Sequence, residues 1–124
     1  MDPCARSALI QIARFLADGP RERPSLIPKH LADWFRAGIP RALGTFRHAL
    51  EDRIETKLPH VRVPTLVVRG SRDPIVPQWW AEEAARLLPR GRLAVLRGGA
   101  HATNYSTPGP FARLVRDFVD GLPA

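Results

Sequence analysis

Residues 65–74 read TLVVRGSRDP, and residues 93–101 read LAVLRGGAH. Each begins with a short apolar run typical of a buried strand and continues into a glycine-containing loop that carries a candidate acid or base, Asp73 or His101. A helical pattern separates the predicted strands, 65–69 and 92–97, so the two form a β-α-β unit and run parallel. Parallel neighbours lie about 4.8 Å apart. We therefore expect Asp73 and His101 to reach hydrogen-bond distance at the edge where α/β sheets place active sites.

An Asp that orients a His is two-thirds of a hydrolytic triad. The third member is usually a Ser flanked by glycines on a sharp strand-to-helix turn. No such frame surrounds any candidate nucleophile in the sequence, namely Ser7, Ser25, Ser71, Ser106 and Cys4. The sequence thus predicts a base and its orienting acid without the group that they would activate. An Asp in such a loop also often just closes its own backbone turn, and a loop His is often merely solvated.

The segment from Leu58 to Leu122 resembles the C-terminal part of an α/β-hydrolase. VPTLVVRGSRDPIVP, over residues 63–77, is similar to that family's acid strand and loop, and GGAHATNY, over residues 98–105, is similar to its histidine loop. The resemblance implies that Asp73 holds the imidazole tautomer. It also implies that His101 takes a proton from a serine and then activates water. It implies no cofactor and no metal.

Residues 1–58 resemble, less specifically, the helical cap of such enzymes. We therefore expect an α/β fold, in which a cap segment (1–58) precedes a core segment (59–124) with two parallel strands flanked by helices. Trp34 and Phe35 in the cap, and Trp79 after the acid loop, are candidates for an acyl pocket, although amphipathic helices usually direct aromatic side chains to a core. Helices are predicted from Asp2-Pro3 to the stop at Gly19-Pro20, from Ser25 or Pro28 to Ala37, from Pro40 through Ile54, from Gln78 to Leu88, and from Thr107 to Gly121.

Composition argues against several other classes. The formal charge of +7 comes almost entirely from arginines spread along the chain, and without a run of like charges or a nucleic-acid motif we expect no nucleic-acid partner. A single cysteine suits a reducing compartment. No apolar run approaches the roughly 20 residues of a membrane span, and no signal peptide is recognisable. These features predict a cytoplasmic protein that is not bound to a membrane.

Two functions follow from the sequence. The first is the C-terminal portion of a hydrolase that acts on an ester, thioester, amide or related bond of a small apolar, acyl-type substrate. The alternative is a non-catalytic binding or interaction domain derived from that family. In either case the apolar strand at 65–69 is expected to have an open edge, which recruits a complementary N-terminal half or a second copy of the chain.

Overall fold

The computed structural model describes residues 7–122. The predicted helix start at Asp2-Pro3 and the candidate Cys4 lie outside the described residues. The elements, in chain order, are α1 (Ala8–Asp18), the 3-10 turn η2 (Gly19–Arg21), α2 (Leu26–Ala37), α3 (Ile39–Glu51), α4 (Ile54–Lys57), the 3-10 turn η3 (Leu58–His60), β1 (Thr65–Gly70), α5 (Gln78–Leu87), β2 (Gly91–Leu96), α6 (Thr103–Ser106) and α7 (Pro108–Asp120). Within residues 7–122, no helix has the length and apolar character needed to cross a bilayer.

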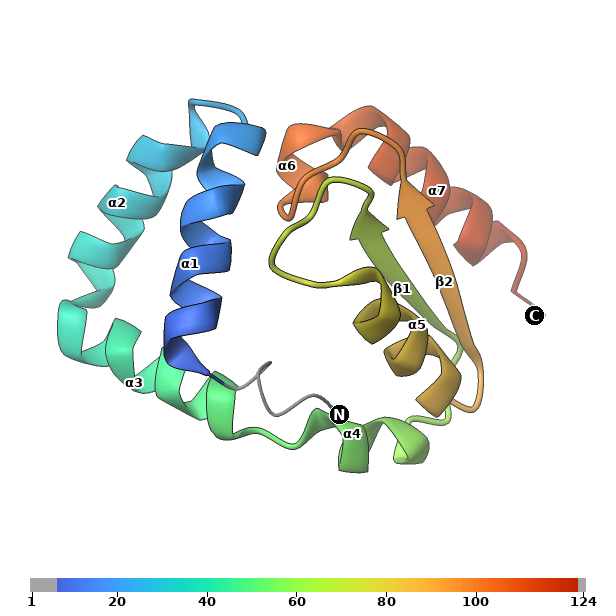
Figure 1. The fold of residues 1–124 in the computed structure, drawn as a ribbon. Coiled ribbons are helices and arrows are strands. Elements are labelled where there is room, and N and C mark those ends of the chain that lie inside the picture. Colours follow the sequence, from blue (N-terminus) through green and yellow to red (C-terminus); the bar gives the residue numbers. More distant parts are fainter. Residues whose placement is uncertain (1–6, 123–124) are drawn as a thin grey trace.

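The predicted parallel strand pair is confirmed. β1 and β2 pair in register from Thr65 opposite Gly91 to Gly70 opposite Leu96. Helix α5 lies on one face of the pair and α7 on the other (Figure 1). The loops that leave the carboxyl ends of both strands lie at the same end of the sheet, as a β-α-β unit requires (Figure 1).

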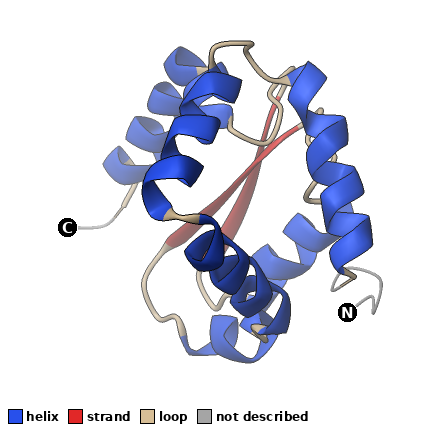
Figure 2. Ribbon diagram, turned by 90° about the vertical axis from the view of Figure 1, so that its left-hand side faces the viewer, coloured by secondary structure: helices blue, strands red, loops and turns tan. Residues whose placement is uncertain are grey.

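Helices α1, α2 and α3 form a group beside the sheet, on the side of β1 (Figures 1 and 2). The helix predicted from Pro40 through Ile54 is shorter in the structure. Helix α3 ends at Glu51 because Asp52 has an extended backbone, and Ile54 begins the separate helix α4. The short helix α6 was not predicted at all. A single turn is too short to show helical periodicity.

The described chain buries little apolar surface. Its buried hydrophobic residues are only Leu26, Ala81, Leu88 and Ala100, while Phe35, Leu9 and Ile39 are each more than two-thirds exposed. The accessible surface is 8579 Å², whereas a compact monomer of this mass exposes about 6,600 Å². The difference is comparable to one side of an obligate protein–protein interface.

The open edge of β1 is part of this exposure. The Thr65 N–H donates to Arg90 O and the Ser71 N–H to Leu96 O, so the odd-numbered residues of β1 direct their backbone groups toward β2. Leu66 and Val68 therefore direct their N–H and C=O groups away from β2. The sheet of the described residues has only these two strands, so it provides no partner on that side.

We predict that the isolated chain self-associates through this edge and is only marginally stable. Leu66→Pro removes an outward-facing donor and should reduce self-association in sedimentation experiments while leaving the β1–β2 ladder intact. The matched variant Val67→Pro removes a ladder donor and should unfold the chain. A monodisperse wild-type monomer that melts cooperatively above about 60 °C would contradict this prediction.

Candidate active site

The site is built on an unusually close approach of two loops, the acid loop (residues 71–77) and the histidine loop (residues 98–105). A Cβ on Gly70 would lie 2.2 Å from Ala100 O and 2.3 Å from Gly99 O, so only glycine fits there. The Arg72 N–H donates to Gly99 O at 2.9 Å. Gly98 has φ +77°, a conformation that favours glycine. These glycines allow the two loops to touch.

The predicted contact between the two ionisable side chains is present. Nδ1 of His101 lies 2.9 Å from Oδ2 of Asp73. The Asp73 side chain is 4% exposed and the His101 side chain is 44% exposed, so the acid is buried behind a ring that reaches solvent. The other carboxylate oxygen, Oδ1, accepts the N–H groups of Ile75 (2.7 Å) and Val76 (3.0 Å). Asp73 thus closes its own turn and also orients the imidazole.

The electrostatics of the pair follow from these contacts. The hydrogen bond to Asp73 raises the pKa of His101; burial opposes the shift, and the negative charges of Asp73, Asp18 and Glu22 add to it. Burial alone would raise the pKa of Asp73, but the hydrogen bonds from His101, Val76 and Ile75 outweigh it and hold that pKa below its ordinary value. The arrangement therefore favours a carboxylate beside an imidazole that accepts a proton readily.

Of the four serines in the described part of the chain, three make other side-chain hydrogen bonds, and Ser7 lies at the opposite end of α1 from Asp18. Ser71 Oγ accepts the Gly98 N–H, Ser106 Oγ donates to Glu22, and Ser25 Oγ is hydrogen bonded to the Tyr105 hydroxyl. Within residues 7–122 no set of three His, Cys, Asp or Glu side chains is arranged to hold a metal ion. The chemistry supported by these residues is proton transfer at His101.

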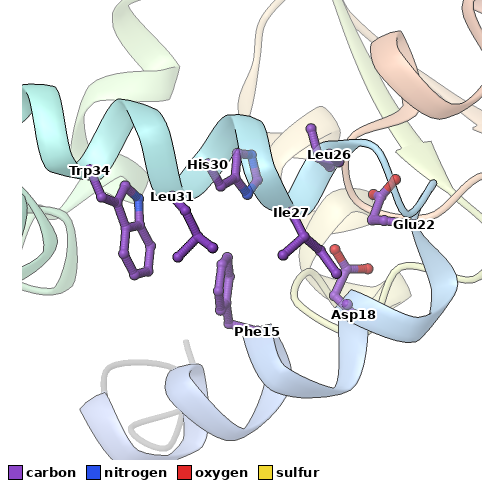
Figure 3. Close-up of a pocket in the computed structure, with 9 residues that line it drawn as sticks. Phe15, Asp18, Glu22, Leu26, Ile27, His30, Leu31 and Trp34 are labelled. Atoms are coloured by element: carbon purple, nitrogen blue, oxygen red, sulfur yellow. The ribbon is translucent and has the colours of Figure 1, made fainter.

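A cavity of about 130 Å³ opens between α1 and α2 (Figure 3). Trp34, one of the predicted pocket residues, lines it together with Phe15, Leu26, Ile27 and Leu31. The ring centroids of Phe15 and Trp34 are 5.9 Å apart and the rings are stacked. The pocket is mostly apolar, with the carboxylates of Asp18 and Glu22 at one end (Figure 3).

The other two predicted pocket residues are not among those that line this cavity. Phe35 is 89% exposed, and Trp79, at the start of α5, is 42% exposed. His30 also lines the cavity and stacks on Phe15 at a centroid distance of 6.4 Å.

Sequence reasoning also missed Asp18 and Glu22. Both are buried, at 6% and 8% exposure, and both accept hydrogen bonds from the histidine loop. The only sequence signal was an acidic residue on either side of the Gly19-Pro20 stop, which has no special meaning by itself.

Comparisons with known proteins identify the family to which the chain is similar. A family model described as TAP-like protein matches residues 46–120, more than half of the chain. A pimeloyl-[acyl-carrier protein] methyl ester esterase from Neisseria meningitidis serogroup B is 39% identical over 98 residues, which cover 77% of this chain and 38% of the relative. A Pseudomonas syringae protein named "Putative carbamate hydrolase RutD" is 33% identical over 109 residues, covering 74% of this chain and 42% of the relative.

The solved structure of a predicted CIB-like hydrolase from Thermoplasma acidophilum matches with a TM-score of 0.54 and 30% identity, covering 57% of this chain and 34% of that one. The chain spans about two-fifths of the length of the two curated relatives.

We predict that Gly70→Ala separates the two loops. The added methyl overlaps backbone atoms that cannot move independently, so we expect a loss of about 1–3 kcal/mol in the free energy of unfolding and disruption of the His101–Asp73 contact. Gly44→Ala is the matched control, because a Cβ at Gly44 meets nothing within 4 Å and alanine favours a helix interior. Denaturant unfolding measures both variants; equal stability would contradict the close approach.

We also predict that Asp73→Asn lowers the pKa of His101, as measured by NMR titration of the ring. In the wild type, the raised pKa of His101 contributes stability that is lost as the pH rises through that pKa. The lowered pKa of Asp73 contributes stability that is lost as the pH falls through it. The difference in unfolding free energy between wild type and variant should therefore be largest between about pH 4 and about pH 6.5.

The control is Asp33→Asn, which removes an exposed carboxylate of α2. An unchanged pKa of His101 in the Asp73→Asn variant would show that the contact with Asp73 does not raise that pKa.

Proposed function

We propose that this chain, which belongs to the α/β-hydrolase family, supplies the acid and the base of a serine-type hydrolytic triad. The observation that carries the proposal is the 2.9 Å contact between a buried Asp73 and a half-exposed His101. A buried carboxylate that holds one ring nitrogen leaves the other available to a reacting group on the solvent side, which is the geometry a general base needs.

In the proposed reaction a serine hydroxyl approaches Nε2 of His101. The imidazole takes the hydroxyl proton as the oxygen attacks the substrate carbonyl, and it then returns the proton to the leaving group. Asp73 stabilises the imidazolium that forms and keeps Nδ1 protonated. In the second half of the cycle His101 activates a water molecule that releases the acyl group.

The nucleophile in this proposal comes from outside the described residues. Ser25, Ser71 and Ser106 are each engaged elsewhere, and Ser7 lies at the opposite end of α1 from Asp18. The open edge of β1 offers the place where a segment carrying it would dock. Leu66 and Val68 present unpaired backbone groups there, which suits the addition of a strand from a complementary N-terminal half.

The proposed substrate is small and largely apolar. Residues 1–58 act as the cap in this proposal, and α1 and α2 provide the apolar cavity of about 130 Å³. A dry cavity of about 150 Å³ admits benzene, so the cavity suits a short acyl chain or one ring. The names of the two curated relatives refer to a methyl ester and a carbamate, and an ester or amide-like bond is proposed here.

A second candidate function is a binding module without catalysis. The engagement of Ser25, Ser71 and Ser106 in other hydrogen bonds favours it. In that case the same apolar cavity would bind a ligand, and the Asp73–His101 pair would serve only to hold the two loops together.

Complementation tests the proposal. We expect the chain alone to hydrolyse p-nitrophenyl butyrate no faster than its His101→Ala variant, since a base without a nucleophile and oxyanion donors gives little rate advantage. Coexpression with the N-terminal part of the Neisseria relative should produce a co-purifying, active pair. Asp73→Asn should reduce its kcat by about 10⁴-fold, and the control His48→Ala should not.

Two outcomes would contradict the proposal. If the chain alone turns over substrate and a fluorophosphonate probe labels Ser71 or Ser106, the nucleophile lies within the chain. If the co-purifying pair is inactive while the chain binds butyrate, the binding module is favoured.

A further inference from the structure

Two buried carboxylates fasten the corner between α1 and α2 to the histidine loop. Oε1 of Glu22 accepts the Ala102 N–H at 2.5 Å, and Oε2 accepts the Ser106 hydroxyl. Oδ1 of Asp18 accepts the His101 N–H at 3.3 Å. Asp18 and Glu22 therefore contact the backbone of the candidate base and of the residue that follows it.

The loop needs such external support. Gly98 and Gly99, which precede His101, restrict the backbone little. Ala102 is the N-cap residue of α6 and provides no side-chain cap. The N–H groups of His101 and Ala102, which precede this helix, donate to the carboxylates of Asp18 and Glu22. These donors in turn offset the cost of burying two acids.

We infer that Asp18 and Glu22 are positioning residues for His101: they fix the loop backbone in the one placement from which the ring reaches Asp73. Asp73 then holds the His101 ring at Nδ1, and the carboxylates of Asp18 and Glu22 hold the backbone of His101 and Ala102. The two carboxylates fix the backbone from which the side chain extends, and Asp73 fixes the orientation of the ring.

The same corner makes further contacts with α6. Ser25 Oγ lies 2.8 Å from the Tyr105 hydroxyl, and Nζ of Lys29 lies 4.9 Å from the centroid of the Tyr105 ring. Asp18 and Glu22 also line the apolar cavity. The segment that shapes the cavity is thus the segment that holds the base, so the helical group and the acid–base pair act as one unit.

The charges act in the same direction as the geometry. The ionisable groups that face His101 are Asp73 from the acid loop, Asp18 from α1 and Glu22 from the corner, and their negative charges raise the pKa of the imidazole. Burial raises the pKa of Asp18, while the hydrogen bond from the His101 N–H lowers it. A substitution that neutralises one of these carboxylates but keeps the size of the side chain should therefore lower the pKa of His101, an effect that a purely structural role would not give.

The experiment uses the full chain and NMR. Glu22→Gln keeps an acceptor for the Ala102 N–H and removes the charge, and Asp18→Asn does the same for the His101 N–H. Both should lower the pKa of His101. Glu22→Ala removes the acceptor of the Ala102 N–H, and the Ala102 amide should then exchange about tenfold faster with solvent, while the His101 N–H keeps its acceptor on Asp18. Glu51→Gln, which neutralises an acid paired with Arg47 on α3, should change neither quantity.

The proposal is overturned if Glu22→Gln and Asp18→Asn both leave the His101 titration unchanged, or if amide exchange in Glu22→Ala rises equally throughout the chain. The two near-isosteric variants keep the test decisive if Glu22→Ala does not fold. The importance of this positioning for catalysis rests on the proposed function, but the NMR readout requires no turnover. An inactive complemented pair with shifted His101 titrations would refute the triad and retain the positioning role. In an active pair, Glu22→Gln should lower kcat with little change in KM.

Discussion

The hydrogen bond between His101 and Asp73 depends on how closely two backbone segments approach each other. β1 and β2 end side by side, with Gly70 opposite Leu96, and the histidine loop then crosses directly over Gly70. The carbonyl oxygens of Gly99 and Ala100 occupy the space that a Cβ would fill. Parallel strands lie about 4.8 Å apart, but their loops usually diverge after the last ladder bond. Here the absence of a side chain at Gly70 keeps them together, so an acid and an imidazole meet within 2.9 Å.

Part of this arrangement was predictable because it is local in the sequence. The apolar runs before Asp73 and His101 gave the strands, and the helix between them fixed the parallel direction. The anchoring by Asp18 and Glu22 was not predictable, because these residues lie about 80 positions before the loop that they hold and nothing in their local pattern indicates a distant partner. Phe35 shows a different limit: helical periodicity marks an apolar position, but whether a partner covers it depends on the tertiary structure.

The two interpretations of Asp73 turned out to be compatible. One carboxylate oxygen closes the turn through Ile75 and Val76, and the other meets the imidazole. The turn aims the second oxygen, because Asp73 cannot rotate without losing two backbone hydrogen bonds. Arg69 adds support by donating to the carbonyl oxygens of Asp73 and Val76 at 2.8 and 2.6 Å. Strong local turn chemistry is therefore no argument against a functional role at this position.

The site and the sheet differ in how complete they are. The acid–base pair already has its hydrogen bonds, its buried acid and its anchored loop, whereas β1 has an open edge and the helices expose apolar side chains such as Leu9 and Phe35. If the proposed function holds, a partner that adds a strand beside β1 meets a base that is already oriented. Docking would then supply the nucleophile and cover apolar surface. This separation has a physical reason: the contacts that orient His101 all lie at the carboxyl ends of the strands, while the strand edge lies alongside them. Helix α1, which carries Asp18, lies on the same side of β1 (Figures 1 and 2), so a strand that pairs with this edge would lie between β1 and the helical group.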